Sequence, residues 1–184
     1  MKYLIFILIF FYPINIFASS KQLIKNKLEE TDNISFKFIQ KIGKKTEQGE
    51  CIISYPKKIF CKYDDIYNKV LVSNGKSLII NSKKITNYLR YNLKDTPLNL
   101  ILDKTFLLDK LNNIEIIQEN DETFSFEIIH NNNLLNIFFD KDSYDLKGWT
   151  TTDVYLNTVE TKLIDIETNK MIDKKLFRVQ NYIN

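Results

Sequence analysis

Few side chains in this 184-residue chain could perform catalysis or bind a metal. His130 is the only histidine, so neither a histidine-based catalytic triad nor a site with several histidine ligands can form within one chain. Asp140–Asp142 is similar to the start of a calcium loop, but Tyr144 and Asp145 stand where a ligand and the essential glycine are required. Asp64–Asp65 has the composition of a turn. The sequence therefore predicts neither an enzyme nor a metal or cofactor site.

The two cysteines offer a different chemistry. Cys51 and Cys61 lie on either side of Pro56, within two stretches that alternate as strands joined by a turn. If this hairpin is centred on Pro56, the two cysteines face each other at the close approach that a disulfide requires. We expect a Cys51–Cys61 disulfide, and two buried free thiols are the alternative.

The N-terminus has the pattern of a secretory signal peptide. Lys2 precedes an almost uninterrupted apolar run, and small residues around Ala18 form a cleavage site. A membrane anchor is the alternative, but Pro13 ends an apolar run that is already shorter than the roughly 20 residues of a spanning helix. We predict that residues 1–18 are a cleaved signal peptide and that residues 19–184 form one exported domain.

The charged residues are numerous but mixed in sign. The chain has 26 lysines and arginines and 23 aspartates and glutamates, a formal net charge of +3, and the two signs are interspersed. A nucleic-acid-binding protein would show a basic stripe, which this sequence lacks. We find no linker, internal repeat or low-complexity tract, and we expect a monomer that does not bind nucleic acid.

Most of the exported chain alternates apolar and polar residues with period two, which predicts strands. Lys21–Asp32 has a single apolar stripe and predicts one leading helix. Gln40–Gly49 is polar and predicts a turn, and Asn74–Gly75 is the strongest hairpin signal. The predicted strands are Ile34–Phe38, Cys51–Tyr55, Ile59–Tyr63, Val70–Ser73, Ser77–Ile80, Ile85–Tyr91, Ile114–Gln118, Thr123–Ile129, Leu134–Asp140, Leu146–Asp153, Val154–Ile166 and Leu176–Val179.

The stretch Thr96–Leu111 is the longest run with helical apolar spacing, and the polar residues 103–105 divide it into two short helices. Pro97 suits a first helical position, with Thr96 as its cap. An apolar helical insert between two sets of strands has to be covered, and the available surface is the face of a curved sheet. Ordinary core filling and a lid over an apolar cavity are both compatible with this pattern. The apolar residues of the insert are Leu98, Ile101, Leu102, Phe106 and Leu107.

Six short motifs follow one another along the predicted strands and the insert. They are Phe36-x-Phe38-x-Gln40, Gly49 opening a strand that ends in Tyr55-Pro56, the run Leu71–Leu78, Thr96-Pro97-Leu98, Leu146-x-x-Trp149 and Asp173-x-x-Leu176-Phe177. In this order and spacing, after a signal peptide, they resemble the periplasmic outer-membrane lipoprotein carrier family, the LolA type. The resemblance implies an α+β fold, mainly antiparallel β, in which a half-open, incomplete β-barrel of about eleven strands is closed by a helical lid.

The resemblance also implies a function and partners. A protein of this type is a periplasmic chaperone without enzymatic activity. It would accept acylated lipoproteins from an inner-membrane lipoprotein-releasing ABC transporter, shield their acyl chains in a hydrophobic cavity, and deliver them to an outer-membrane lipoprotein receptor. Burial of each methylene is worth about 0.8 kcal/mol, so an apolar cavity can hold a lipid that would otherwise stay in a membrane.

The period-two alternation and the resemblance together predict which residues form the candidate site. We expect the acyl-chain cavity to be lined by Phe36, Phe38, Ile53 and Ile59 from the strands, with the five apolar residues of the insert forming the lid. Typical members carry an arginine before the hairpin proline, which is thought to hold the lid by hydrogen bonds. Here that residue is Tyr55, whose hydroxyl could still donate to a helix carbonyl, so Tyr55 is the candidate lid latch.

Two further interpretations remain at this point. Tyr55, together with a chain that stops at Asn184 without the C-terminal extension of better-known members, leaves room for a related periplasmic lipid-binding or envelope-sensor domain on the same scaffold. An envelope hydrolase is the other, but the sequence offers no set of acid, base and nucleophile for it.

Overall fold

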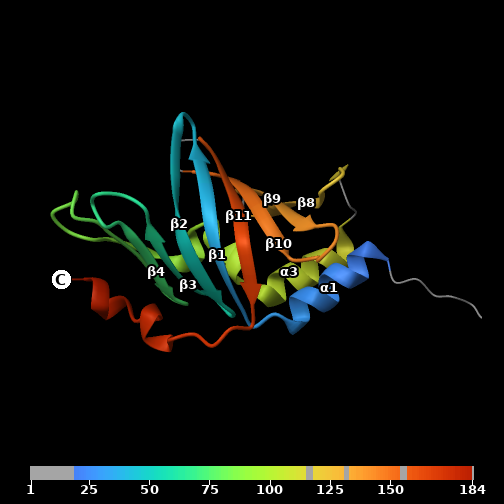
Figure 1. The fold of residues 1–184 in the computed structure, drawn as a ribbon, viewed down its shortest axis with the longest axis horizontal. Coiled ribbons are helices and arrows are strands. Elements are labelled where there is room, and N and C mark those ends of the chain that lie inside the picture. Colours follow the sequence, from blue (N-terminus) through green and yellow to red (C-terminus); the bar gives the residue numbers. More distant parts are fainter. Residues whose placement is uncertain (1–18, 115–117, 131–132, 154–156, 184) are drawn as a thin grey trace, which may run out of the picture.

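A computed structural model describes residues 19–114, 118–130, 133–153 and 157–183. The predicted signal peptide lies outside these residues, and so do parts of the predicted strands Ile114–Gln118 and Val154–Ile166. Within the described residues, the chain forms one curved antiparallel sheet with helices on its concave side (Figure 1).

The sheet contains eleven strands in the order β6-β5-β4-β3-β2-β1-β11-β10-β9-β8-β7. They are β1 (Asn33–Ile42), β2 (Lys45–Ser54), β3 (Lys58–Tyr63), β4 (Val70–Asn74), β5 (Ser77–Asn81), β6 (Leu89–Asn92), β7 (Gln118–Glu119), β8 (Thr123–His130), β9 (Asn133–Asp140), β10 (Leu146–Thr152) and β11 (Thr158–Thr168). The helices are α1 (Ser20–Glu30), α2 (Leu98–Leu102), α3 (Lys104–Asn113) and the 3-10 turns η1 (Leu93–Asp95), η2 (Lys174–Phe177) and η3 (Val179–Tyr182).

The order of the strands explains why the insert lies across the sheet. Pairing of β1 with β11 joins two sets of consecutive hairpins, so that β6 and β7 become opposite edges of one sheet. The connection from β6 to β7 contains α2 and α3, and it must therefore cross the whole concave face. The expected fold class, a half-open, mainly antiparallel barrel with a helical covering, is confirmed.

Two glycines permit the close approach of neighbouring strands. A Cβ atom on Gly49 of β2 would lie 2.2 Å from the carbonyl oxygen of Lys62 on β3. A Cβ atom on Gly148 of β10 would lie 2.5 Å from the carbonyl oxygen of Thr161 on β11. No side chain fits at these distances, so glycine is required at both points of the sheet.

The hydrophobic core fills the space between the concave face and the helices. Inward side chains of β1, β2, β3, β8, β9, β10 and β11 contact Ile24 and Leu28 of α1 and buried residues of α2 and α3. A second, smaller cluster lies on the convex face, where Val179 of η3 packs against Val72 and Ile79. The strands β4 and β5 are thus covered on both faces. Apolar residues at consecutive positions are typical of strands that are covered in this way.

The helical insert has the predicted division into two helices. Asp103 separates α2 from α3, and its side chain accepts a hydrogen bond from the Phe106 amide at 3.1 Å, as an N-cap residue does. The predicted cap differs, because the Thr96 hydroxyl donates instead to the Leu93 carbonyl of η1 at 2.8 Å.

Three predicted boundaries were wrong. Residues 40–49 do not form a long turn, because β1 and β2 continue to Ile42 and Lys45 and are joined at Gly43, which has a φ of +56°. Leu176–Val179 is not a strand but parts of η2 and η3, where Phe177 and Val179 are buried against the sheet. The predicted strand Ile85–Tyr91 shortens to β6, after a run of turns.

Candidate functional site

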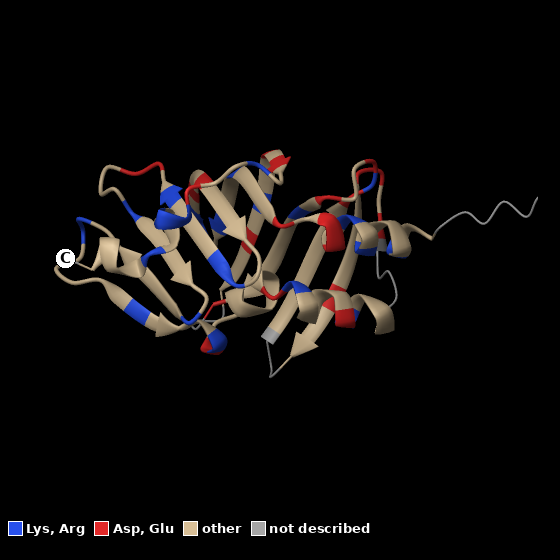
Figure 2. Cartoon of the chain, turned by 90° about the horizontal axis from the view of Figure 1, so that it is seen from below, with Lys and Arg blue, Asp and Glu red and all other residues tan. Residues whose placement is uncertain are grey.

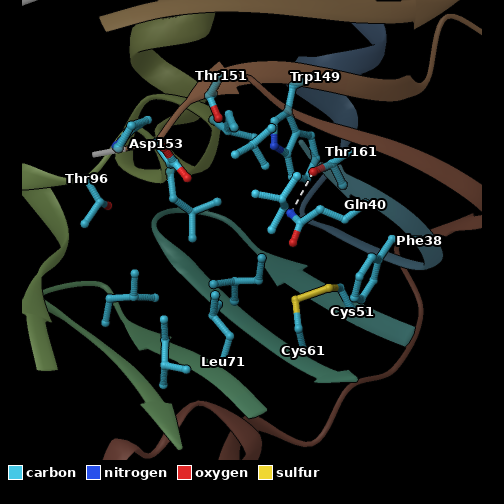
Figure 3. A pocket seen from close by; sticks show the side chains of 18 of the residues that line it. Phe38, Gln40, Cys51, Cys61, Leu71, Thr96, Trp149, Thr151, Asp153 and Thr161 are labelled. Atoms are coloured by element: carbon cyan, nitrogen blue, oxygen red, sulfur yellow. Dashed lines mark hydrogen bonds between the residues drawn. A yellow bond between two sulfur atoms is a disulfide. The ribbon is translucent and has the colours of Figure 1, made fainter. Parts of the chain in front are cut away.

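A cavity of about 320 Å³ lies between the concave face and the start of the insert (Figure 3). Its walls come from the inward side chains of β1 to β5, β10 and β11 and from the N-terminal part of α2. The lining residues are Phe38, Gln40, Ile42, Cys51, Ile59, Cys61, Tyr63, Lys69, Leu71, Leu78, Ile80, Thr96, Pro97, Leu98, Ile101, Trp149, Thr151, Thr152, Asp153, Val159 and Thr161.

Four of the nine residues expected at the cavity lie on its wall. Phe38 and Ile59 contribute from the sheet, and Leu98 and Ile101 contribute from α2. Cys51 and Cys61 lie opposite each other in the β2–β3 register, with Cα atoms 4.1 Å apart, and their sulfurs form a disulfide on the cavity wall.

The other five expected residues lie away from the cavity, in the packed core. Phe36 contacts the ring of Trp149 edge-on, and Ile53, Leu102 and Leu107 are at most 1% exposed. Phe106 is half-buried and contacts His130 edge-on. All five residues face the hydrophobic core, as expected. In that part of the core, α3 and the side chains around it fill the space.

Sequence reasoning missed the residues that form the rim of the cavity. Gln40 and Ile42 follow Phe38 at every second position of β1, so all three side chains face the same side of the sheet. A predicted strand that continued to Ile42 would have included them. The Gln40 amide donates to the Thr161 hydroxyl of β11 at 2.9 Å. That contact depends on the pairing of β1 with β11, which no local pattern in the sequence indicates. Trp149 on β10 reaches the cavity for the same reason.

The predicted latch at Tyr55 was wrong. Its hydroxyl is buried but has no hydrogen-bond partner among the described residues, and burial raises the pKa of Tyr55 well above its usual value. The ring packs against the hydrophobic core, with the Lys104 ammonium 5.8 Å from its centre. Tyr55 therefore supports the insert by packing rather than by a hydrogen bond.

Lys57, two residues further along the turn, makes the contacts that were expected of a latch. Its amide donates to the Leu102 carbonyl at the end of α2 at 2.8 Å, and its ammonium lies 2.9 Å from the Asp103 carboxylate. The Lys57 carbonyl accepts from the Ser73 hydroxyl at 3.0 Å, which ties this turn to β4. Asp103 thus caps α3 and binds the β2–β3 turn through one carboxylate.

Magnitudes show what holds α2 in place. The Lys57–Asp103 pair is partly exposed and is worth less than about 1 kcal/mol, and the backbone hydrogen bond adds about 1 kcal/mol. Burial of Ile101 and Leu102, both 0% exposed, contributes about 1.5–3 kcal/mol for each side chain. Apolar burial dominates, and the latch contacts set the position of α2.

Few charged side chains line the cavity, and the described residues do not form a metal site. Among the lining residues, Lys69 and Asp153 alone carry charge, and Asp153 accepts from the Asn157 amide at 2.8 Å. No group of three or more His, Cys, Asp or Glu ligands occurs within the described residues. Lysines and carboxylates are interspersed over the sheet and loops (Figure 2).

Asp140 belongs to the stretch that is similar to a calcium loop, but its carboxylate accepts hydrogen bonds from neighbouring protein groups. Burial alone would raise its pKa, but hydrogen bonds from the backbone amides of Ser143 and Asp142 and from the Lys147 ammonium outweigh this and lower the pKa to about 2. Its carboxylate holds the turn between β9 and β10.

The fold and the cavity define the class of this protein, a half-open sheet with an apolar cavity beneath a helical insert. The family model of the outer membrane lipoprotein carrier protein LolA matches residues 29–180, so the chain belongs to the LolA family, a family of carriers. A search of curated proteins found no match. None of the helices in the described part of the chain is long and apolar enough to span a membrane.

Solved structures share the fold at very low sequence identity. An uncharacterized conserved protein from Thermus thermophilus aligns with a TM-score of 0.55 and 7% identity, over 87% of this chain and 94% of that one. A domain described as an outer membrane lipoprotein-sorting protein from Vibrio parahaemolyticus gives 0.52 and 10%, over 89% and 96%. MucB gives 0.51 and 10%, over 90% of this chain and 65% of that one. At these identities the likeness concerns the fold alone.

Proposed function

We propose that this protein is a periplasmic carrier that binds the acyl chains of lipoproteins in the cavity beneath α2 and transports them from the inner to the outer membrane. The observation that carries the proposal is the cavity itself, whose floor is apolar and whose cover is a short helix inserted between the two edges of the sheet. Membership of the LolA family supports it.

The size of the cavity limits what it holds in this conformation. A volume of about 320 Å³ is at the lower end of the roughly 300–1,000 Å³ that is usual for small-molecule sites. It accommodates part of one acyl chain. A lipoprotein with two or three chains therefore requires α2 to move outward, which enlarges the cavity.

Transfer between membranes places a condition on this movement. An inner-membrane lipoprotein-releasing ABC transporter would load the open state, and an outer-membrane lipoprotein receptor with greater affinity for the cargo would unload it. The open state must then cost only a few kcal/mol, because a ligand shifts such an equilibrium by no more than its difference in affinity for the two states. Signal-peptide cleavage after Ala18 would release the protein into the periplasm.

The decisive experiment is release of lipoproteins from membranes. Mature protein purified from periplasm is incubated with spheroplasts that carry acylated lipoproteins, and the soluble fraction is examined by native mass spectrometry. We expect a one-to-one complex with an acylated lipoprotein. A protein that stays bare in the presence of releasable lipoproteins would contradict the carrier function.

A matched pair of variants links release to the cavity. Leu98→Glu places a carboxylate on the cavity wall at a half-buried position and should abolish release, while circular dichroism shows an intact sheet. Ile129→Glu introduces the same group at a position that is 71% exposed on β8 and should leave release unchanged.

A related lipid-binding or envelope-sensor role on the same scaffold is the second candidate, because the same fold and apolar cavity are compatible with it. The same experiment separates the two candidates. Recovery of the protein with phospholipid alone, and without lipoprotein, would favour this second role.

A further inference from the structure

A second hollow adjoins the cavity at one end of the sheet. This groove, of about 510 Å³, lies over the loops and strand ends between β2 and β6, and its charged lining residues are Lys45, Glu47, Asp64, Asp65, Lys69 and Lys84. It shares Tyr63, Lys69 and Ile80 with the apolar cavity. The two hollows are therefore neighbours, and these three side chains separate them. The cavity is apolar and the groove is polar.

Lys69 occupies the boundary. Its ammonium lies 2.6 Å from the Glu47 carboxylate and 3.7 Å above the centre of the Tyr63 ring. The second oxygen of Glu47 pairs with the Lys45 ammonium. The side chains of Lys69 and Glu47 are 21% and 10% exposed, so this arrangement is largely withdrawn from water. Two ammonium groups share the Glu47 carboxylate, and Asp64 and Asp65 also line the groove, so that its six charged side chains, three of each sign, sum to zero.

The groove and one end of the cavity lie at the same end of the sheet. The strand register places Glu47 beside Gln40, Lys62 beside Val70, and Val70 beside Asn81. Ile42 and Val159, which line the cavity, are paired at this same end. A ligand whose chain occupies the cavity therefore extends its other end toward Lys69.

We propose that the groove receives the oxygen-bearing polar end of an acylated ligand, and that Lys69 binds its acceptor oxygens, carboxylate, phosphate or ester, in exchange for Glu47. This inference rests on the proposed function and adds an orientation to it: acyl chain beneath α2, polar end over Tyr63 and Lys69. Lys69 is the only cation among the described residues that line the cavity, so it is the group that can make this bond from within.

The exchange is chemically balanced. Lys69 keeps its charge, because an acceptor oxygen of the ligand replaces a carboxylate oxygen of Glu47, and Lys45 continues to neutralise Glu47. No bond breaks except hydrogen bonds. The Lys69 ammonium lies over the face of the Tyr63 ring, so a small movement across this face can turn it from Glu47 toward a ligand oxygen.

The test compares two probes that differ in the head group alone. Palmitate and hexadecanol, each brominated at the chain end, quench the fluorescence of Trp149, the only tryptophan, which lines the cavity. Wild-type protein should bind the palmitate about tenfold more tightly, as expected for a charge-assisted bond. Lys69→Met should remove this preference and leave hexadecanol affinity within about twofold of wild type.

Two further variants exclude general effects. Glu47→Gln removes the competing carboxylate and should increase palmitate affinity, opposite in sign to Lys69→Met, which a folding defect would not produce. Lys62→Met removes an exposed lysine that lines neither hollow and should change nothing. Equal affinity for both probes, or a preference that persists in Lys69→Met, overturns the inference while the carrier function stands. Failure of the wild type to bind either probe overturns both.

The same titration identifies the source of the acceptor oxygens. A diacyl lipopeptide presents ester and amide carbonyls, whereas lysophosphatidylglycerol presents a phosphate. Weaker lipopeptide binding by Lys69→Met assigns the groove to the polar linker of a lipoprotein. An effect limited to the phosphate probe and palmitate assigns it to an anionic lipid, and no effect on any of the three probes contradicts the proposed bond.

Discussion

Two regions of the same concave face differ in how they are filled. The packed half consists of β8, β9 and β10 beneath α1 and α3, where Phe126 and Phe139 are at most 1% exposed and their ring centres lie 5.9 Å apart. The cavity half consists of β2 to β5 beneath α2, where side chains such as Ile59 and Leu78 end at an open space. Both halves alternate in the same way along their strands.

The difference lies in side-chain size and in the helix above. The packed half supplies three inward phenylalanine rings, those of Phe124, Phe126 and Phe139, and faces α3, which has ten residues and buries Leu107 and Leu111. The cavity half supplies isoleucine, leucine and cysteine side chains and one aromatic ring, that of Tyr63, and it faces α2, which has five residues. A short helix over short side chains leaves a space. The cavity is thus the part of the core that the side chains do not fill.

The largest expected effect compares one leucine from each half. Leu135→Ala in β9 removes a fully buried side chain and should lower the free energy of unfolding by about 4 kcal/mol. Leu78→Ala in β5 should cost about 2 kcal/mol, because one side of Leu78 already lacks contact partners. Denaturant unfolding measures both. Equal losses would show that the cavity half is as well packed as the other.

An intermediate effect is expected from the disulfide. Reduction opens a loop with a sequence separation of 10 residues and should cost about 2–3 kcal/mol. The Cys51→Ala, Cys61→Ala double variant serves as the comparison. Because the bridge joins two strands of the cavity half, hydrogen exchange should accelerate in β2 to β4 before it does in β8 to β10. A melting temperature unchanged by reductant would argue against a bridge.

The smallest effect on stability should come from the latch contacts. Lys57→Met removes the partly exposed pair with Asp103, so the free energy of unfolding should fall by less than about 1 kcal/mol, while acyl probes should load faster, as followed by Trp149 fluorescence. Tyr55→Phe is the matched control. It removes a buried hydroxyl that has no hydrogen-bond partner in the described part of the chain, and it should leave stability unchanged or slightly higher. Faster loading in Tyr55→Phe alone would restore Tyr55 as the latch.

Local patterns predicted what local physics controls. The period-two alternation, the Asn74–Gly75 hairpin and the break at Asp103 all depend on residues close in sequence, and all three appear in the structure. The facing of Cys51 and Cys61 followed from the Pro56 turn for the same reason. The errors at residues 40–49 and 176–179 came from polar or mixed stretches, whose conformation depends on the strand or face against which they pack.

The sequence by itself determined the strands, the insert and the apolar character of the inner face, because each follows from the spacing of side chains along one segment. Only the tertiary structure decided which inner residues meet the cavity and what holds the insert. Pairing of β1 with β11 brings Thr161, and Trp149 next to it, beside Gln40, and crossing of the sheet brings Leu102 to Lys57. These contacts join segments far apart in the chain, and their geometry exists only once the sheet has curved around its helices.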